Sequence, residues 1–536
     1  MDLTQEVKAW IADDPDPKTA AQLQQWLDSN NEVELRTSFS GFLQFGTAGL
    51  RGPIRPGPSG MNRAVVGRTA AGLAAYMKER NLTSVVIGRD ARYGSEDFTF
   101  ETAQIMSGAG MKVYVLPRPL PTPVLAFATN ELKCDVGIMV TASHNPPQDN
   151  GYKVYLGGTV DGIHYRGSQI VSPTDESIAQ KIDSITSLAS QPRGKEWTVL
   201  GEEVVDKYVG ITAALANKPG NLKIVYTAMH GVGTETLQQV FHKAGFPQPI
   251  LVDSQAKPDP DFPTVAFPNP EEPGAIDLAL ETARAFDADL VIANDPDADR
   301  CAAAVKDPVK GWRMLRGDEL GVILGETIAR ATTQGILANS IVSSSILSKI
   351  AAHYKLDFKE TLTGFKWLAK IDGLTFGYEE ALGYAVDAVT VNDKDGISAA
   401  IKLAQIATDL AAQNKTLLDL LDEVWARHGF HATEQISIRL SDLSQVGVIM
   451  GNLRSNSPKE IAGRSVTSID DLAKPKDGLP PTDGLRIWLD GGIRIIIRPS
   501  GTEAKMKCYI EAIAKDSATA QAVLDQLRAP LKELLS

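Results

Sequence analysis

Three aspartates stand at alternate positions after a short apolar run, in the stretch "DLVIANDPDADR". Carboxylates this close raise one another's pKa unless a cation neutralises them. A hard divalent cation that prefers oxygen ligands, Mg²⁺ above all, is the simplest partner for Asp295, Asp297 and Asp299. A solvated acidic turn is the plainer alternative. Arg300 follows directly, where it can hold a phosphate beside the metal or pair with one of the aspartates.

Two other motifs begin with a similar carboxylate pattern. An EF-hand loop requires glycine at its sixth position and glutamate at its twelfth. Counted from Asp295, these positions hold Arg300 and Lys306, so the EF-hand is excluded. Aspartyl phosphatases of the haloacid dehalogenase type also begin D-x-D after a strand, usually with Thr or Val at the fifth position. This chain has Asp299 there, which weakens that alternative and leaves it open.

A second candidate centre is Ser143 in "VTASHNPPQDNGYK", which follows the apolar run "DVGIMV". No G-x-S-x-G elbow surrounds it. Neighbouring side chains in a strand or helix point to different sides, so we expect no nucleophile–base contact between Ser143 and His144. A phosphorylated serine, stabilised by Mg²⁺ and cationic side chains, is the better chemical interpretation. A serine that only caps a turn is the plainer alternative.

Turns that combine glycine with arginine predict anion sites. "IRPSGTEAK" places Arg498, Ser500, Gly501 and Thr502 after an apolar strand, where amides, hydroxyls and a guanidinium can cradle a phosphate that does not react. A turn of this sequence without any ligand is common, so the motif indicates a phosphate site only in combination with the other motifs.

Further arginines occur in or beside glycine-containing loops, namely Arg51 in "FGTAGLRG" and Arg89 and Arg92 in "VVIGRDARYGS". Each can be a structural turn with a surface ion pair, but together with the carboxylate triad they favour phosphate chemistry. In "TFGYEEALGY", Glu379 and Glu380 can accept hydrogen bonds from vicinal sugar hydroxyls or, alternatively, can begin a helix.

Strand-type runs alternate with helix-length amphipathic stretches along most of the chain, which is typical of α/β domains with largely parallel sheets. The expected strands are "SVVIGRD", "KVYVL", "VGIMVTA", "LKIVYTAMH", "DLVIAND" and "SIVSSS". Beyond residue 430 the pattern changes to hairpins and a terminal helix, which predicts a smaller α+β domain. We therefore expect domains at residues 1–203, 204–314, 315–430 and 431–536.

Composition and charge limit the class of protein. A formal net charge of −12 argues against a general nucleic-acid binder, which needs a broad basic face. The chain has no stretch of about 18 apolar residues, so we expect no membrane span. The N-terminus lacks the pattern of a signal peptide. The three cysteines are far apart, which fits reduced thiols in a cytoplasmic protein.

Taken together, the motifs resemble those of the α-D-phosphohexomutases, the phosphoglucomutase/phosphomannomutase superfamily. "TASHNP" is similar to the family's phosphoserine loop, "DPDADR" to its Mg²⁺ loop, "GYEEA" to its sugar loop and "RPSGTEAK" to its phosphate loop. "FGTAGLRG", "GRDARYGS", "NGYKVY", "FPNPEE" and "TLTGFKW" follow the family's order, so the resemblance spans about residues 40 to 510. The spelling is most similar to the branch that holds bacterial phosphoglucomutases and phosphopentomutase-like enzymes.

The resemblance implies three mixed α/β sheet domains and a C-terminal α+β domain around a central cleft. It implies Ser143 as the phosphoryl carrier, with Mg²⁺ on the three aspartates and on a phosphoserine oxygen. Arg51 and Lys153 would flank the reacting phosphoryl group, with Lys153 as general acid/base and His144 as a supporting residue. The implied substrate-binding residues are Thr363, Gly364, Lys366, Glu379, Glu380, Arg498, Ser500, Gly501, Thr502, Lys505 and Arg300.

We therefore predict a cytoplasmic phosphosugar mutase that interconverts glucose 1-phosphate and glucose 6-phosphate through a phosphoserine and a sugar 1,6-bisphosphate. Phosphopentomutase and phosphomannomutase activities are alternatives, because Ala381 stands where the family's sugar loop usually has serine. A Mg²⁺-dependent aspartyl phosphatase and a non-catalytic sugar-phosphate sensor are alternatives of another class. The expected partners are small sugar phosphates, with neither nucleic acid nor membrane, and the expected assembly is a monomer or homodimer.

Overall fold

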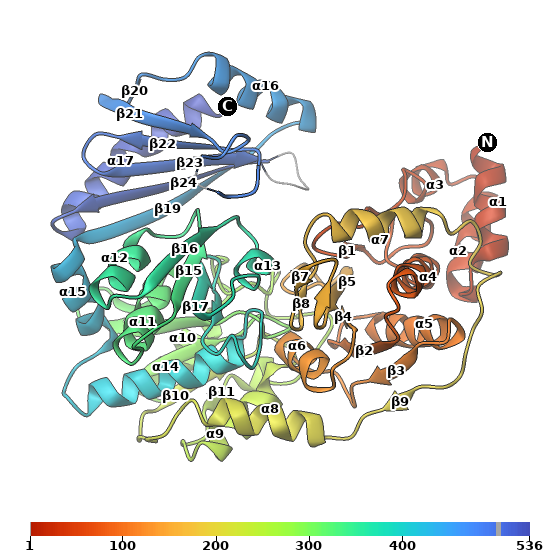
Figure 1. Ribbon diagram of the computed structural model, residues 1–536, viewed down its shortest axis with the longest axis horizontal. Helices are drawn as coiled ribbons and strands as arrows, with labels where there is room; N and C mark the ends of the chain where they lie inside the picture. The colour runs from red at the N-terminus through yellow and green to blue at the C-terminus, as the bar shows by residue number, and fades with distance from the viewer. Residues whose placement is uncertain (1, 477, 500–504) are drawn as a thin grey trace. The chain divides into compact units, whose positions relative to one another are not determined.

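The computed structural model describes residues 2–476, 478–499 and 505–536 (Figure 1). The chain forms two compact units, and each is described by itself. The first unit comprises Met1–Leu315, Ala369–Asp372 and Gly383–Ala412. The second comprises Arg316–Leu368, Gly373–Leu382 and Gln413–Ser536.

The first sheet of the first unit carries the Ser143 region. Its strand order is β1-β5-β4-β2-β3-β9, with β8 beside β5. Strand β4 pairs with β2 in parallel and with β5 in antiparallel fashion, so the sheet is mixed. All five residues of β4 are buried, as expected for a strand covered on both faces. The strands are β1 (Leu50–Pro53), β2 (Ser84–Arg89), β3 (Lys112–Val115), β4 (Val136–Val140), β5 (Asp149–Leu156), β8 (Ser168–Gln169) and β9 (Thr198–Val199).

Helices cover this sheet, and one of them begins with a side-chain cap. The side chain of Asn62 accepts a hydrogen bond from the Val65 amide at the start of α4. The helices of this region are α4 (Arg63–Glu79), α5 (Ser95–Gly108), α6 (Thr122–Glu131) and α7 (Thr174–Asp183). A short hairpin of β6 (Thr159–Val160) and β7 (Ile163–His164) follows β5.

The second sheet of the first unit carries the aspartate triad. Its order is β11-β10-β12-β13-β14, with parallel pairing of β10 to β11 and β12 and antiparallel pairing beyond. The strands are β10 (Ile224–Thr227), β11 (Ile250–Leu251), β12 (Leu290–Ala293), β13 (Ala302–Asp307) and β14 (Gly311–Met314). The other elements of this unit's later part are α8 (Glu203–Ala213), α9 (Gly233–Lys243), α10 (Asp277–Ala285), β18 (Gly383–Ala385) and α14 (Gly396–Ala411).

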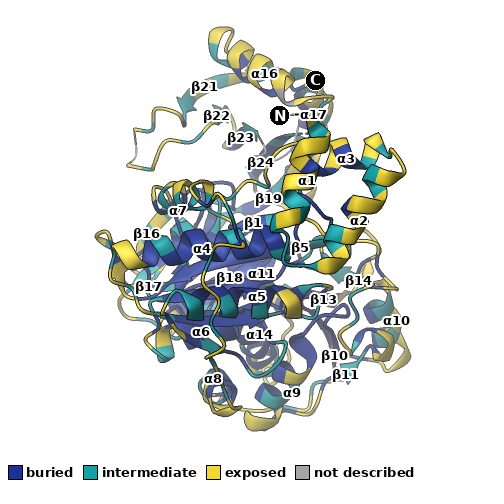
Figure 2. Ribbon diagram, turned by 90° about the vertical axis from the view of Figure 1, so that its right-hand side faces the viewer, coloured by how far each residue is buried: buried dark blue, intermediate teal, exposed yellow. Residues whose placement is uncertain are grey.

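Three N-terminal helices form a small core of their own within the first unit. They are α1 (Leu3–Asp13), α2 (Pro17–Asp28) and α3 (Glu32–Ser38). Val7, Leu23 and Leu35 are its buried centre. Figure 2 shows that these helices are largely exposed, whereas burial concentrates in the sheets and in helices such as α4 and α11.

The second unit begins with a parallel set of strands, β16-β15-β17. Helices α11, α12 and α13 alternate with these strands, and α15 follows. The elements are α11 (Gly317–Arg330), β15 (Ile336–Ser340), α12 (Ile346–His353), β16 (Asp357–Thr361), α13 (Phe365–Leu368), β17 (Leu374–Glu379) and α15 (Leu417–His428).

An antiparallel sheet completes the second unit, in the order β19-β24-β23-β22-β21-β20. Its core includes Ile495 and Ile497 of one strand and Leu524 and Leu527 of the terminal helix. The elements are β19 (Phe430–Arg439), α16 (Leu443–Ser455), β20 (Glu460–Ile461), β21 (Arg464–Asp471), β22 (Leu485–Leu489), β23 (Ile493–Pro499), β24 (Lys505–Ala514) and α17 (Ser517–Leu534).

The predicted fold class, mixed α/β sheets followed by an α+β region, is confirmed. One predicted strand is misplaced: β15 ends at Ser340, and residues 341–345 of "SIVSSS" form a loop before α12. The serines there satisfy polar groups near the helix start rather than a sheet ladder, a competition that serine side chains favour. Within the described residues, no helix has the length and hydropathy that a bilayer crossing requires.

Candidate functional site

The aspartate triad lies in the loop after β12, and all three side chains are buried. One carboxylate oxygen from each of Asp295, Asp297 and Asp299 lies within 4.8 Å of the other two. Among the described residues, Oδ1 of Asp297 and Oδ1 of Asp299 are buried without any hydrogen-bond partner. Buried acceptors are normally satisfied, so this donor set fits a hard divalent cation such as Mg²⁺.

Two buried lysines partly balance the triad. The Lys153 ammonium donates to Oδ2 of Asp297 at 2.8 Å and to Oδ2 of Asp299 at 3.0 Å. The Lys394 ammonium donates to the same Asp299 oxygen at 2.9 Å. Burial opposes charge on Lys153, but the two aspartates outweigh it and raise the pKa of its ammonium. The pKa of Asp295 is raised well above its ordinary value by burial and by the neighbouring carboxylates, which a cation would relieve.

Ser143 lies in the turn that follows β4, within the Ser143 loop (residues 141–148). Its backbone φ is +53°, a left-handed conformation that is uncommon for residues other than glycine. The turn is held by a hydrogen bond from the Ser143 amide to Oγ1 of Thr141 at 2.9 Å. This conformation directs Oγ of Ser143 to Oδ2 of Asp295, at 2.9 Å. The serine and the carboxylate triad therefore form one cluster.

The expectation that the side chains of Ser143 and His144 point to different sides, from which we excluded a nucleophile–base contact, is wrong. Oγ of Ser143 lies 3.1 Å from Nδ1 of His144. The expectation assumed strand or helix geometry, whereas the left-handed φ of Ser143 brings the adjacent side chains together. Burial, Arg300 and Arg51 hold the pKa of His144 well below its ordinary value, so the imidazole is neutral. With the serine proton donated to Asp295, Nδ1 of His144 is the donor to Ser143.

Arg92 holds the backbone of the Ser143 loop. Its guanidinium is buried and donates to the carbonyl oxygens of Ser143 and Asn145, each at 2.6 Å, and of Pro146 at 2.7 Å and Asp149 at 3.1 Å. The fork of guanidinium donors matches this set of acceptors. The prediction of a phosphate role therefore fails for Arg92, whose donors serve the loop.

The other arginines of the glycine-containing loops differ in their contacts. Arg51 on β1 donates to Oδ1 of Asn145 in the Ser143 loop at 3.2 Å. Arg89 pairs with the exposed Glu96 at 3.0 Å, which is the surface ion pair named as its alternative. Gly49, before Arg51, has φ +74°, and a Cβ there would lie 1.8 Å from the Tyr152 carbonyl oxygen. Only glycine allows this approach of the Arg51 strand to β5.

Arg300 lies beside the triad that it follows in sequence. Its amide donates to Oδ1 of Asp295 at 3.0 Å, and its Nε lies 3.9 Å from Oδ2 of Asp295 and 4.0 Å from Oδ1 of Asp299. This geometry is the ion pair proposed as one of its two roles.

Sequence reasoning missed two residues that contact the triad. Lys394 lies in "NDKDG", far along the chain from Asp299 and outside every motif that was singled out. Thr122 donates through Oγ1 to Oδ2 of Asp297 at 2.7 Å. Neither residue is preceded by a distinctive pattern, because tertiary packing alone brings them to the carboxylates.

The predicted sugar loop lies in the second unit, at the end of β17. Oε1 of Glu379 accepts a hydrogen bond from the Gly364 amide at 2.6 Å, which brings "GYEEA" and "TLTGFKW" together. Oε2 of Glu380 accepts from Ser340 at 3.1 Å and from Ser343 at 3.0 Å. The helix-start alternative for these glutamates is wrong, since Glu379 ends β17 and Glu380 follows it in a turn. Thr363 precedes the Gly364 turn, and Lys366 lies in α13.

The predicted phosphate loop joins β23 to β24. Arg498 lies near the end of β23, and Lys505 is the first residue of β24. The two strands pair in antiparallel register with Arg498 opposite Lys507. Ser500, Gly501 and Thr502 lie outside the described residues.

Comparison with known proteins covers most of the chain. Models of the phosphoglucomutase/phosphomannomutase domains match in sequence order: α/β/α domain I over residues 43–189, domain II over 204–311, domain III over 316–428 and the C-terminal domain over 451–529.

Three curated relatives differ in the sugar that their names imply. The chain is 49% identical over 482 residues to a probable phosphomannomutase of Haemophilus influenzae, covering 89% of this chain and 98% of that protein. It is 34% identical to a phosphopentomutase of Mus musculus, with 96% and 90% covered. It is 33% identical to a phosphoglucomutase of Staphylococcus haemolyticus, with 90% and 92% covered.

Proposed function

Because this chain belongs to the phosphoglucomutase/phosphomannomutase family, whose members are intramolecular phosphotransferases, we propose that it moves a phosphoryl group between C1 and C6 of glucose. Ser143 is the proposed carrier, and a glucose 1,6-bisphosphate is the proposed intermediate and activator. The observation that carries this proposal is the hydrogen bond from Ser143 to Asp295, in a cluster where two buried carboxylate oxygens have no hydrogen-bond partner among the described residues.

The proposed reaction consists of two transfers. Phospho-Ser143 gives its phosphoryl group to the free hydroxyl of the sugar monophosphate, so the P–O bond to serine breaks and a P–O bond to the sugar forms. The bisphosphate then turns over, and its other phosphate returns to Ser143. In each transfer one proton leaves the attacking oxygen and one reaches the departing oxygen. Lys153 is proposed as the group that gives and takes it.

The residues around Ser143 have distinct proposed tasks. Mg²⁺ would be held by Asp295, Asp297 and Asp299 and would stabilise the negative charge of the phosphoryl oxygens. Arg51 and Arg300 bring positive charge to the same group. His144 donates from Nδ1 toward the serine oxygen, which orients it for transfer. The lysine ammonium, with its raised pKa, enters the cycle charged and adds electrostatic stabilisation.

The proposal of a hexose rests on two relatives, a probable phosphomannomutase and a phosphoglucomutase, and the proposal of glucose rests on the second of them. Glu379 and Glu380 are proposed to accept hydrogen bonds from ring hydroxyls, and Arg498, Ser500, Gly501, Thr502 and Lys505 to bind the phosphate that does not react. Thr363, Gly364 and Lys366 are proposed to complete the sugar site. A pentose is the second candidate, favoured by the mouse phosphopentomutase and by Ala381 in place of the usual serine.

The cysteines support a reducing compartment for this enzyme. Cys134, Cys301 and Cys508 are all free and buried. Free thiols of this kind persist where disulfide formation is suppressed, which supports the proposal of a cytoplasmic location.

The experiment that tests the function is a substrate panel. Purified protein with Mg²⁺ and a catalytic amount of sugar bisphosphate is assayed for phosphate migration in the 1-phosphates of glucose, mannose, glucosamine and ribose. We expect the highest kcat/KM for glucose 1-phosphate. A higher value for mannose or ribose overturns the sugar assignment alone. Binding without turnover of any of the four identifies a sensor and overturns the mutase assignment.

A further inference from the structure

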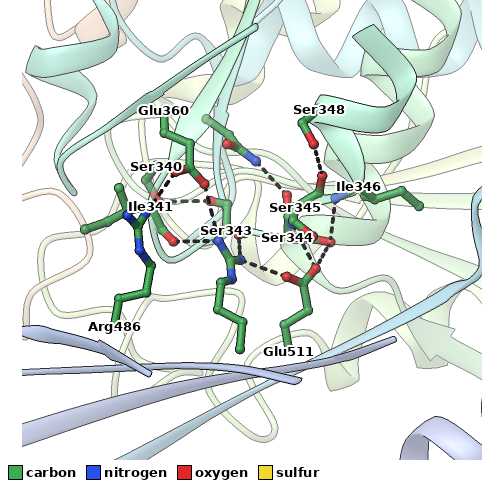
Figure 3. Close-up of polar contacts among 12 residues, drawn as sticks. Ser340, Ile341, Ser343, Ser344, Ser345, Ile346, Ser348, Glu360, Arg486 and Glu511 are labelled. Carbon is green, nitrogen blue, oxygen red and sulfur yellow. Dashed lines mark hydrogen bonds and ion pairs between the residues drawn. The ribbon is translucent and has the colours of Figure 1, made fainter. Parts of the chain in front are cut away.

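A second serine-rich loop, the Ser343 loop (Ser340–Ser345), follows β15 in the second unit. It lies between the sugar-loop glutamate Glu380 on one side and the buried charges of β23 and β24 on the other. Figure 3 shows the serines of this loop with Glu511 directed toward Ser344 and Ser345, and with Glu360 directed toward Arg486. The sequence motifs did not predict this network of contacts.

Arg494 on β23 holds the backbone of the Ser343 loop. Its side chain is buried, and its guanidinium donates to the Ile341 carbonyl oxygen at 3.1 Å and to the Ser343 carbonyl oxygen. The same guanidinium pairs with Oε1 of Glu360 at 3.3 Å and with Oε2 of Glu511 at 3.0 Å. A hydrogen bond to Glu360 orients the guanidinium, and the charge of Glu511 attracts it, so its bonds to the two carbonyl oxygens are directional.

Glu511 on β24 holds the next part of the loop. Its Oε1 accepts from the Ser344 hydroxyl at 2.6 Å and from the Ser345 amide at 2.8 Å, at the start of α12. Burial alone would raise the pKa of Glu511, but Arg494, His431 and Ser344 outweigh it and lower the pKa to about 2. The carboxylate is therefore ionised at neutral pH and caps the N-terminus of α12.

His431 completes the cluster with a defined tautomer. Its Nε2 lies 3.1 Å from the ammonium of Lys349, which can only donate. Nε2 is therefore the acceptor, and Nδ1 carries the hydrogen that is donated to Oε1 of Glu511 at 2.9 Å. Both ring nitrogens of His431 thus have a matched partner. Oε2 of Glu511 has no hydrogen-bond partner among the described residues and is held by its ion pair with Arg494.

The far side of the Ser343 loop holds the sugar loop. The hydroxyls of Ser340 and Ser343 both donate to Oε2 of Glu380, and the Glu380 amide donates back to Oγ of Ser343 at 3.1 Å. Glu380 is thus held by side chains whose own backbone is held by Arg494. The chain of contacts runs from the strand that leads into the predicted phosphate loop to the predicted sugar loop.

We infer that Arg494 is a positioning residue for sugar recognition: it fixes the Ser343 loop so that Ser340 and Ser343 hold Glu380, and with it Glu379, for the ring hydroxyls. This inference rests on the proposed function, since it assigns the sugar contacts to "GYEEA". Arg494 touches neither substrate nor reacting atoms. Its effect is therefore on which sugar is accepted, and chemistry at Ser143 is unaffected.

The test compares Arg494→Lys with Arg486→Lys in the full-length Mg²⁺-loaded enzyme. Lysine keeps the charge but lacks the fork that reaches two carbonyls and two carboxylates. Arg486 is the matched control, because it pairs with the same Glu360, at 3.2 Å, and its replacement leaves the bonds of Arg494 in place. Each variant is assayed with glucose 1-phosphate and with its 2-, 3- and 4-deoxy analogues.

We expect the wild type and Arg486→Lys to prefer glucose 1-phosphate over at least one deoxy analogue. Arg494→Lys should reduce this preference by about 10-fold, the effect of one hydrogen bond to a charged group, through a higher KM for the parent sugar. A purely structural defect would lower kcat/KM for all substrates alike, and the ratio between glucose 1-phosphate and the deoxy analogues would stay that of the wild type. Ser343→Ala, which cuts the contact to Glu380 directly, should reproduce the reduced ratio if Arg494→Lys does not fold.

The outcomes separate the two proposals. An unchanged preference in Arg494→Lys and Ser343→Ala, in an enzyme that turns over, overturns the positioning role alone. A wild type that turns over none of the sugars overturns the proposed function, and the positioning role with it.

Discussion

The Ser143 loop and the Ser343 loop are built on the same plan in two different units. Each follows the carboxyl end of a strand that pairs in parallel with a neighbour, β4 with β2 and β15 with β16. In each, a buried arginine donates to the carbonyl oxygens of the loop, Arg92 in the first and Arg494 in the second. A guanidinium clamp on loop carbonyls is thus a shared way of holding serines at a strand end.

The two loops differ in what remains unsatisfied. Oγ of Ser343 donates to the Glu380 carboxylate at 3.0 Å and accepts from the Glu380 amide at 3.1 Å, so its bonding capacity is used within the protein. Ser143 instead faces a carboxylate cluster in which Oδ1 of Asp297 and of Asp299 have no hydrogen-bond partner among the described residues. In the proposed mechanism, the reactive serine is Ser143, which lies beside acceptors without hydrogen-bond partners. Ser343, whose hydrogen bonds are all made within the protein, supports sugar recognition.

The largest effect that this comparison predicts is from Ser143→Ala set against Ser343→Ala. Removing the carrier should lower kcat by at least about 1,000-fold, as for other covalent nucleophiles. Removing the second hydroxyl should change substrate preference and leave most of kcat. Steady-state kinetics on both variants test this prediction. Equal losses of kcat would contradict the different roles assigned to the two loops.

Metal removal should be the next largest effect and should be confined to the first unit. Chelation should abolish turnover and Mg²⁺ should restore it, because two buried carboxylate oxygens have no hydrogen-bond partner among the described residues and would bind the cation. Independently of activity, Mg²⁺ should raise the thermal unfolding midpoint of the wild type by ligand stabilisation. Asp297→Asn should lose this rise, while Glu380→Gln in the second unit should keep it. A rise retained in Asp297→Asn would contradict the metal assignment.

Arg92→Lys should have an intermediate effect of a different kind from Arg494→Lys. Loosening the Ser143 loop displaces the serine oxygen, so kcat should fall about 10- to 100-fold while KM changes little. The preference among deoxy sugars should stay that of the wild type. If Arg92→Lys instead changes sugar preference, the assignment of Arg92 to catalysis and of Arg494 to sugar recognition is wrong.

The smallest predicted effect concerns two glutamates that contact the Ser343 loop and whose pKa values are shifted in opposite directions. Burial, Glu379 and Asp318 raise the pKa of Glu380 to about 7, whereas that of Glu511 is lowered to about 2. A raised carboxyl pKa contributes stability below the unfolded value, and this stability is lost as pH rises through the folded value. The unfolding midpoint of wild type relative to Glu380→Gln should therefore fall by a few degrees between about pH 5 and 7.

Glu511→Gln is the matched control for that measurement. Glu511 is ionised in both folded and unfolded chains throughout that pH window, so its difference from the wild type should stay flat there and shrink only at lower pH. A slope in the control similar to that of Glu380→Gln would show that the pH dependence comes from elsewhere.

Short-range patterns predicted much of the fold and of the site. The aspartate triad and Ser143 lie at strand ends because an apolar run followed by turn residues specifies that position locally. The His144 contact was missed because a left-handed φ at Ser143 cannot be read from residue types. Residues 341–345 read as a strand because the apolar pair before the serines fits one, whereas the loop is fixed by Arg494 and Glu511, which are distant in sequence.

Long-range contacts set the remainder. Lys394 reaches Asp299 from 95 residues away, and Arg92 reaches the Ser143 carbonyl from 51 residues away. Such pairs depend on how the elements pack. The residues around a lysine or arginine in a polar stretch do not indicate which distant residue it will contact. Arginine in a glycine-containing loop was expected to bind phosphate, but loop carbonyls are equally good acceptors for its fork.

The measurement that tests the account most directly is the identification of the phosphorylated residue. The protein is incubated with Mg²⁺ and radiolabelled glucose 1,6-bisphosphate, digested, and the labelled peptide is mapped before and after hydroxylamine. The account predicts label on the peptide that contains Ser143, stable to acid and hydroxylamine, and no label in Ser143→Ala. Label on the peptide that contains Asp295, released by hydroxylamine, would contradict it.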